Sequence, residues 1–280
     1  MDDRNTAPFR LHSLWRFPVK SMGGEELFAA DVTPRGLLGD RAYALVDAEN
    51  KVGTAKKRPS LLHFQARFIK PPQLDTPIPA VRITPPDGTS ETNEQTGLDE
   101  AVSNSLAHEV TLKASAPKDL ALEFPAGTLS GKYAALTESP VAGAAPSGTF
   151  FDYAVVHLLT TSTLARLHDA YPQGRFDIRR FRPNIVVETA EAGFVENSWI
   201  GRTLALGDEL LLRITIPCPR CVMPTLSQSD LPRDTGILRT AAQENRLNLR
   251  DFGELPCVGV YANVLRPGRI HPGDTLRLLD

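Results

Sequence analysis

Short apolar segments separated by turn residues recur along the whole sequence, and this pattern constrains the fold more than any other feature. Alternating apolar and polar residues bounded by Gly, Pro, Asn or Asp are typical of β-strands. In the first half we predict strands over 10–17, 24–33, 41–54, 61–69, 80–89 and 109–115, with a hairpin turn at 48–50 and a short helix over 100–108. Neither a βαβ rhythm nor a glycine-rich phosphate loop occurs, so a dinucleotide-binding fold is not expected.

The second half continues the strand pattern, interrupted by two helical stretches. Leu164, Leu167 and Tyr171 are spaced for a helix, with Ser162 or Thr163 as the candidate N-cap. A second helix is predicted over 234–247, and strands over 183–189, 204–216 and 258–279. The segments LGDELLL and PGDTLRLL each lead from a Gly-Asp turn into an alternating strand, which fits a small barrel built from hairpins.

The length favours two domains, and a change of composition indicates where they meet. A chain of 280 residues commonly divides into two units. Residues 116–148 are rich in Pro, Ala, Gly and Ser and lack clear periodicity, so we predict a linker or crossing segment there. The predicted domains are therefore 1–115 and 149–280, in a chain that is mostly β with some α.

The composition narrows the classes of protein and partner. A hydrophobic fraction of 41% and a charged fraction of 23% are those of an ordinary globular protein. The net charge of −2 gives no general basic field, so we expect neither polymeric nucleic acid nor a membrane as a partner. The sequence has no apolar run of about eighteen residues, and its acidic opening MDDRNTAPFR does not resemble an export signal. A cytoplasmic location is expected.

Two of the three cysteines stand in the sequence PCPRC at the end of a predicted strand, and several interpretations compete. Structural zinc needs four ligands, but Cys257 stands alone and no histidine pair has metal-ligand spacing. A redox dithiol usually opens a helix, whereas prolines flank and separate Cys218 and Cys221. Two buried structural thiols are a further alternative. That alternative leaves Arg220 unexplained, because a guanidinium beside a thiol favours the thiolate.

Another interpretation is a single soft thiolate for a metal that brings most of its own ligands. Molybdenum held by a pterin dithiolene fits, because that cofactor supplies two sulfurs and the protein needs to supply one more. Such a protein also needs cations and amides for the phosphate and the pterin, rather than a ring of metal-binding side chains. Other parts of the sequence have to provide these groups.

Five motifs that occur in order resemble the landmarks of the MOSC family. They read FPVKSMGG, GLLGDRAYALVD, FRPNIVVE, PCPRCVMPT and GVYANVLRPG. Together with the preceding β-rich region, they are similar to the branch of the family that contains the amidoxime-reducing proteins. The resemblance implies an N-terminal β-barrel-like domain followed by a MOSC β-barrel with peripheral helices. It also implies a molybdenum cofactor in the cleft between the two domains.

The resemblance implies a set of site residues as well. Cys221 corresponds to the molybdenum ligand and is a predicted catalytic residue, and Asp152 is the first candidate for a proton donor. The residues implied to bind the cofactor are Lys20, Ser21, Arg41, Thr160, Arg182, Asn184, Pro219 and Tyr261. Lysine and arginine form charge-assisted hydrogen bonds with phosphate oxygens, and an amide can both donate to and accept from a pterin edge.

Each predicted cation also has an interpretation that needs no ligand. Lys20 would then be a solvated surface cation, since most charged residues are exposed. Arg41 would pair with Asp40 or Asp47, and Arg182 would belong to a basic cluster with the two arginines before it. The residues predicted to be structural are Cys218, Cys257, Trp15, Phe17 and Trp199.

The reaction implied by the resemblance is reduction of a small N-hydroxylated compound to the amine or amidine and water. The electrons would come from a separate donor protein, because an iron–sulfur cluster needs four cysteine ligands and the sequence has three cysteines. An alternative from another class would also use Cys221, namely a sulfur-transfer protein or a molybdenum cofactor carrier. Bound metal and turnover of a hydroxylamine distinguish these functions.

Overall fold

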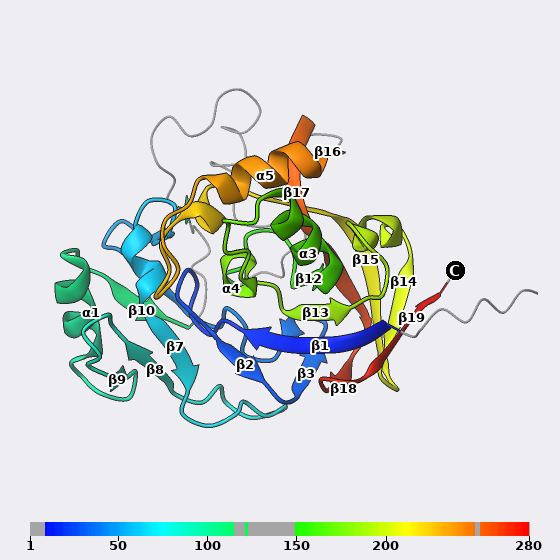
Figure 1. The fold of residues 1–280 in the computed structure, drawn as a ribbon. Helices are drawn as coiled ribbons and strands as arrows, with labels where there is room; N and C mark the ends of the chain where they lie inside the picture. Colours follow the sequence, from blue (N-terminus) through cyan, green and yellow to red (C-terminus); the bar gives the residue numbers. More distant parts are fainter. Residues whose placement is uncertain (1–8, 115–120, 123–148, 250–252, 280) are drawn as a thin grey trace, which may run out of the picture.

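The computed structural model describes residues 9–114, 121–122, 149–249 and 253–279. Strands account for 38% and helices for 19%, so the predicted class, mostly β with some α, is confirmed. Figure 1 shows a barrel on one side of the molecule and a group of smaller sheets beside it. The predicted linker 116–148 lies outside the described residues, except for the two-residue strand β11 (Ala121–Leu122).

Seven strands close into the barrel. In sheet order they are β12 (Val156–Thr160), β13 (Ile185–Glu188), β1 (Phe9–Arg16), β19 (Thr275–Leu279), β14 (Thr203–Leu206), β15 (Leu210–Pro219) and β17 (Gly253–Arg266). The sheet closes because β17 pairs back onto β12. Two further strands extend it, since β16 (Arg246–Leu249) pairs with β17 and β2 (Glu25–Leu27) pairs with β1. The barrel predicted from the repeated turns is therefore confirmed.

The first strand of the chain belongs to this barrel and lies between strands from the second half. β1 pairs with β13 through Leu14 and Ile185, and with β19 through Phe9 and Leu276. A second link of this kind joins β3 (Ala30–Thr33) to β18 (Gly268–Ile270). The predicted division at 115 and 149 stays a prediction, but the barrel takes strands from both sides of it.

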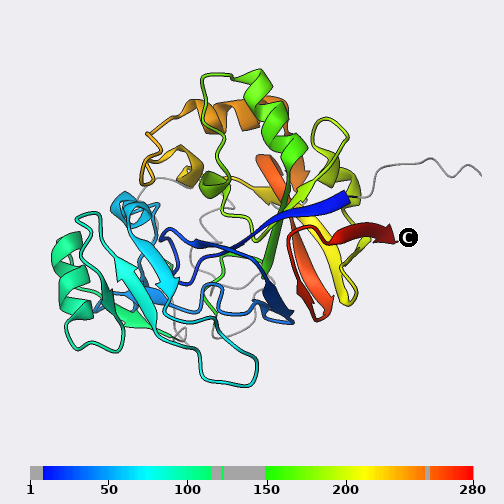
Figure 2. The same cartoon turned by 60° about the horizontal axis from the view of Figure 1, so that its bottom comes forward.

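Three smaller sheets hold the remaining described strands, and the two that come entirely from the first half lie to the left of the barrel in Figures 1 and 2. One contains β10 (Thr111–Lys113), β5 (Ala44–Val46), β6 (Lys51–Val52) and β11, another β7 (Gln65–Phe68), β8 (Val81–Thr84) and β9 (Glu91–Thr92), and a third β18, β3 and β4 (Gly36–Leu37). The hairpin predicted over 41–54 is present as β5 and β6. Its turn is fixed by the Asp47 carboxylate, which accepts from the backbone N–H groups of Glu49 and Lys51.

Helices cover the outside of the sheets, and α3, α4 and α5 lie along one side of the barrel in Figure 1. They are α1 (Leu98–Leu106), α3 (Thr161–Ala170), α4 (Ile178–Phe181) and α5 (Gly236–Glu244), with 3-10 turns η1 (Pro59–His63), η2 (Val195–Trp199) and η3 (Met223–Thr225). The predicted N-cap of α3 is wrong: Thr160, not Ser162 or Thr163, caps it by accepting from the Thr163 N–H. No helix in the described part of the chain has both the length and the apolar character of a membrane span.

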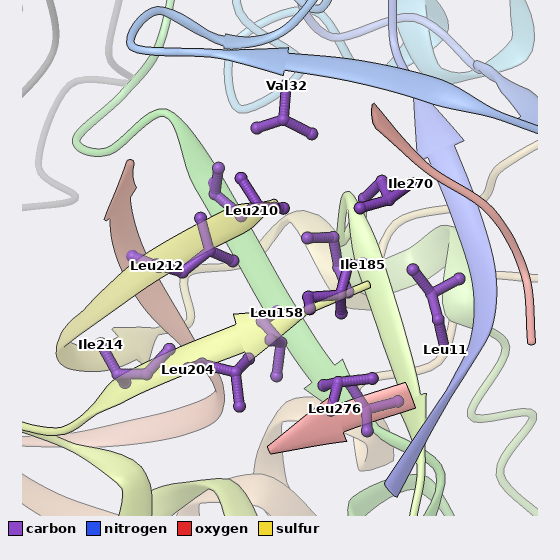
Figure 3. Close-up of a cluster of buried hydrophobic side chains, with 14 of the residues drawn as sticks. Leu11, Val32, Leu158, Ile185, Leu204, Leu210, Leu212, Ile214, Ile270 and Leu276 are labelled. Carbon is purple, nitrogen blue, oxygen red and sulfur yellow. The ribbon is translucent and has the colours of Figure 1, made fainter. Parts of the chain in front are cut away.

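Aliphatic side chains from all seven strands fill the barrel. Figure 3 shows them pointing into the interior; buried members include Leu11, Leu158, Ile185, Leu204, Leu212, Ile214, Val260 and Leu276. Because side chains alternate across a strand, one face of each strand can line the interior while the other faces outward. Fully burying one such side chain contributes about 1.5–3 kcal/mol.

A second apolar core lies among the smaller sheets and extends to the cysteine motif. Its buried members include Val19, Met22, Leu45, Leu61, Phe64, Ile83 and Val102. Val222, Met223 and Leu226, which follow the second cysteine of the motif, pack against this core. The segment after Cys221 is therefore held against the first half of the chain.

Exchanging Leu158 for Ala tests the barrel core. The side chain is fully buried, and its removal leaves a cavity, so we expect the free energy of unfolding to fall by about 2–5 kcal/mol in urea titrations. Leu265→Ala is the control, because that side chain is 57% exposed and its loss is expected to change stability by less than about 0.5 kcal/mol. Similar losses for both variants would contradict the packing described here.

Candidate functional site

The cysteine motif marks the point where β15 leaves the barrel. Pro217 and Pro219 have no N–H to donate, and the pairing of β15 with β17 is irregular at both residues. Cys218, between them, is completely buried, whereas Cys221 lies beyond the strand and is exposed. Cys257, on β17, is also buried, and burial raises the pKa of its thiol to about 12. Cys221 is therefore the cysteine that a ligand can reach.

Arg220 connects the cysteine motif to α4. Its guanidinium donates to the Cys218 sulfur over 3.0 Å and to the Phe181 carbonyl over 3.0 Å. Burial opposes the charge, but Cys218, Tyr261 and Cys221 raise the pKa of Arg220 overall. Its Nε atom is buried and has no hydrogen-bond partner among the described residues. A buried donor without a partner is unfavourable, so this atom is available to a bound acceptor.

Lys20 is buried, so its interpretation as a solvated surface cation is wrong. Its ammonium group donates to the Phe150 carbonyl over 2.7 Å and to the Asp152 carboxylate over 2.6 Å. Burial lowers the pKa of Lys20, and Asp152 partly offsets this effect. Burial alone would raise the pKa of the Asp152 carboxyl. The positive charges of Lys20, Lys56 and Arg41 outweigh this effect and hold its pKa well below the ordinary value. The Asp152 side chain, which is 53% exposed, is thus an ionised acceptor at neutral pH.

Arg41 and Arg182 meet at the ring of Phe17. Both residues have left-handed backbone conformations, with φ of 47° and 56°, and their guanidinium carbons lie 4.8 and 4.1 Å from the ring centre. Arg41 donates to Asp40, as the interpretation without a ligand predicts, and also to the Arg182 carbonyl. Burial, followed by the charge of Arg41, lowers the pKa of Arg182 to about 9. A bound anion would stabilise this crowded positive charge.

Two predicted cofactor contacts are occupied by the protein itself. The Asn184 amide donates to Asp40 over 2.9 Å and accepts from the His157 N–H, so it ties β13 to β12 and to the loop before Arg41. The Ser21 hydroxyl accepts from the Ala55 N–H over 3.1 Å. Their roles toward a cofactor stay predictions, and in this structure both side chains hold the surrounding loops in place.

Thr160 is not brought to the cations. Its hydroxyl donates to the Glu196 carboxylate over 2.6 Å, and Thr163 donates to the same carboxylate over 2.8 Å. All three side chains are buried at the start of α3, where burial raises the pKa of Glu196. The contacts of Thr160 are those of a helix cap.

Aromatic rings contact Tyr261, another residue predicted to bind the cofactor. Its ring stacks on Tyr153 at 5.6 Å and meets the edge of His157 at 5.8 Å. Burial and the charge of Arg220 lower the pKa of His157 to about 3. A Cβ at Gly259 would lie 2.5 Å from the His157 ring, so glycine allows this close approach of β17 to β12. Pro219, half-buried, pairs with Cys257 opposite.

The site has more positive than negative charge. Its cations are Lys20, Lys56, Arg41, Arg182 and Arg220, and its carboxylates are Asp40 and Asp152. Lys56, Asp40 and His157 were not among the site residues predicted from the sequence. The run AKKRP was the one signal for Lys56, while no pattern marked His157. Five described cations against two carboxylates form a place for an anionic ligand within a chain of net charge −2.

A hollow of about 470 Å³ adjoins Arg182. Its walls come from both halves of the chain, and they include Trp15, Phe17, Gly24, Gln65, Arg67, Arg179, Gln228 and Ser229. Trp15, predicted to be core, is half-buried here, whereas Phe17 and Trp199 are buried as predicted. This volume is within the range of small-molecule sites.

The lowered pKa of His157 predicts a pH dependence of stability. Between pH 7 and pH 5 the unfolded imidazole binds a proton that the folded one does not, so stability falls as the pH falls. With an ordinary pKa of about 6.5, this group removes about 2 kcal/mol of unfolding free energy over that interval. His157→Gln should reduce the loss between pH 7 and pH 5 by about that amount in urea titrations. An identical loss in both proteins would contradict a neutral buried His157.

Both halves of the chain are similar to known protein families. Residues 146–277 match the family model described as MOSC domain, and residues 8–129 match that of the MOSC N-terminal beta barrel domain. The chain is 25% identical to mitochondrial amidoxime reducing component 2 of Homo sapiens, over 93% of this chain and 81% of the relative. It is 26% identical to mitochondrial amidoxime-reducing component 1 of Mus musculus, over 95% and 81%.

Among solved structures, the YUAD protein from Bacillus subtilis aligns with 98% of this chain and 97% of its own, with a TM-score of 0.47 and 12% identity. The two family models together cover nearly the whole described chain, from the first barrel strand to the last. The chain therefore belongs to the MOSC family, with a MOSC N-terminal beta barrel domain ahead of its MOSC domain.

Proposed function

We propose that this protein is a molybdenum-cofactor-binding oxidoreductase that reduces N-hydroxylated compounds with electrons from a separate donor protein. The observation that carries the proposal is an exposed thiol, Cys221, next to a surplus of cations drawn from both halves of the chain. The names of the relatives, amidoxime-reducing components, support the class of substrate.

The residues fit the chemistry of a phosphorylated pterin that carries molybdenum. Cys221 would be the protein ligand of the metal, since a thiolate is a soft ligand. Lys20, Arg41 and Arg182 would hold the phosphate and pterin ends through charge-assisted hydrogen bonds. The unpartnered Nε of Arg220 offers a donor next to the cysteine motif.

The overall reaction consumes two electrons and two protons: R–NHOH + 2 e⁻ + 2 H⁺ gives R–NH2 + H2O. When bound, the molybdenum cofactor supplies the two-electron oxygen-atom chemistry, and the protein positions it. Tyr153, which directly follows Asp152 in the chain, stacks on Tyr261. In the Lys20–Asp152 pair the proton resides on Lys20, so Asp152 would act as an acceptor or relay of protons before it could donate one.

Exchange of single cysteines tests the assignment of the metal ligand. We expect Cys221→Ser to lose molybdenum and Cys218→Ser to retain it, because the structure exposes the first thiol and buries the second. Molybdenum and pterin per protein, measured after expression in a cofactor-competent host, provide the readout. Equal retention in both variants would refute the assignment.

Turnover separates an enzyme from a carrier. The loaded protein, supplied with a chemical reductant and a hydroxylamine or amidoxime, should form the amine or amidine, and Cys221→Ser should fall to the background rate. A molybdenum-loaded protein without turnover would favour the cofactor carrier. Metal-free protein with sulfane sulfur on Cys221 would favour the sulfur-transfer protein.

A further inference from the structure

We propose that Arg180 and Arg220 form a reciprocal clamp that positions Cys221 relative to Arg182. The Arg220 guanidinium donates to the backbone of α4, which carries Arg180, and the Arg180 guanidinium donates to the backbone that follows Cys221. The inference rests on the proposed function, because it assigns Cys221 to the metal and Arg182 to the pterin. Arg180 and Arg220 are positioning residues in this account.

Arg180 is completely buried, and its hydrogen-bond partners in the described part of the chain are backbone carbonyls. Its Nε donates to the Arg175 carbonyl over 2.8 Å. Its terminal nitrogens donate to Pro224 over 2.9 Å, Leu226 over 3.2 Å and Pro232 over 2.7 Å. Three of these carbonyls belong to the segment 224–232 that follows Cys221. One side chain of α4 thus fixes the course of that whole segment.

Arg220 makes the complementary contact from the cysteine motif to α4. It donates to the Phe181 carbonyl, directly after Arg180, and its own backbone N–H donates to the Pro256 carbonyl over 2.8 Å. Cys221 therefore lies between two anchored points, Arg220 before it and Pro224 after it. Both points are tied to the same short helix.

That helix also carries the predicted pterin contact. α4 ends at Phe181, and Arg182 is its left-handed C-cap. Phe181 is buried and its ring stacks on Phe176 at 6.5 Å, which anchors the helix in the core. The clamp consequently links the candidate metal ligand to the residue that would grip the organic part of the cofactor.

The geometry needs arginine rather than a positive charge alone. A guanidinium presents five N–H donors in a plane, whereas an ammonium presents three from one nitrogen and cannot reach carbonyls on several sides. Burial lowers the pKa of Arg180, so keeping a charge there is unfavourable. An apolar side chain could fill the same volume without the desolvation penalty of a buried charge, but it could not donate to the carbonyls of segment 224–232.

Arg175 provides a matched control. Its guanidinium reaches the same segment, because it donates to the Asp230 carbonyl over 3.0 Å and forms an ion pair with the Asp230 carboxylate, but both side chains are more than half exposed. An exposed ion pair contributes little to stability. Arg175→Lys keeps the backbone carbonyl that accepts from Arg180, so it is expected to leave the position of Cys221 unchanged.

The test compares Arg180→Lys, Arg220→Lys and Arg175→Lys by two measurements. In metal-free protein, hydrogen exchange at the amides of Leu226, Leu231 and Asp234 should speed up in the first two variants and not in the third. In loaded protein, molybdenum loss during dialysis against a chelator should be about 10- to 100-fold faster in the first two, as expected for residues that orient a metal ligand. Arg220→Lys keeps the test intact if Arg180→Lys does not fold.

Three outcomes would overturn the clamp. One is unchanged exchange at these three amides, and another is faster exchange with molybdenum held as tightly as in the parent protein. The third is an equal effect of Arg175→Lys. A parent protein that never contains molybdenum would instead contradict the proposed function, and exchange in the metal-free protein would still decide whether the clamp holds segment 224–232.

Discussion

The pairing of β1 between β13 and β19 is the constraint on which the rest of the structure depends. It places the beginning of the chain inside a barrel that is otherwise built from the second half. The chain leaves β1 at Arg16, and Phe17 and the Met22 carbonyl then contact Arg182 at the end of α4. This pairing holds the cations of the first half close to Arg182 and Arg220 of the second half.

The site that results is electrostatically unfavourable when it holds no anion. Arg41 and Arg182 stack on the same phenylalanine, and burial penalises both Lys20 and Arg182. The protein offsets part of this repulsion with Asp40, Asp152 and many backbone carbonyls. Structures tend to keep such positive charge where a ligand neutralises it, and anionic groups with several oxygens suit forked guanidinium donors. The proposed phosphorylated cofactor is an anion of this kind.

The strands and turns could be predicted from the sequence because period-two alternation and Gly-Asp turns are local signals. The partner of β1 could not, because a strand's alternation says which face is buried but not which distant strand it joins. The resemblance implies that Thr160 binds the cofactor, whereas its contacts in the structure are those of a helix cap. The motifs predicted Lys20, Arg41 and Arg182, which the structure brings close together. The carbonyl contacts of Arg180 follow from tertiary structure and leave no pattern in the sequence.

X-ray absorption at the molybdenum edge tests the central claim most directly, because it reports the atoms bound to the metal. For protein from a cofactor-competent host, the account predicts a cysteine sulfur in addition to the dithiolene sulfurs, and the same sulfur shell in the Cys218→Ser variant, which keeps Cys221. A metal that binds no protein sulfur, or one that loses a sulfur in Cys218→Ser, would contradict it.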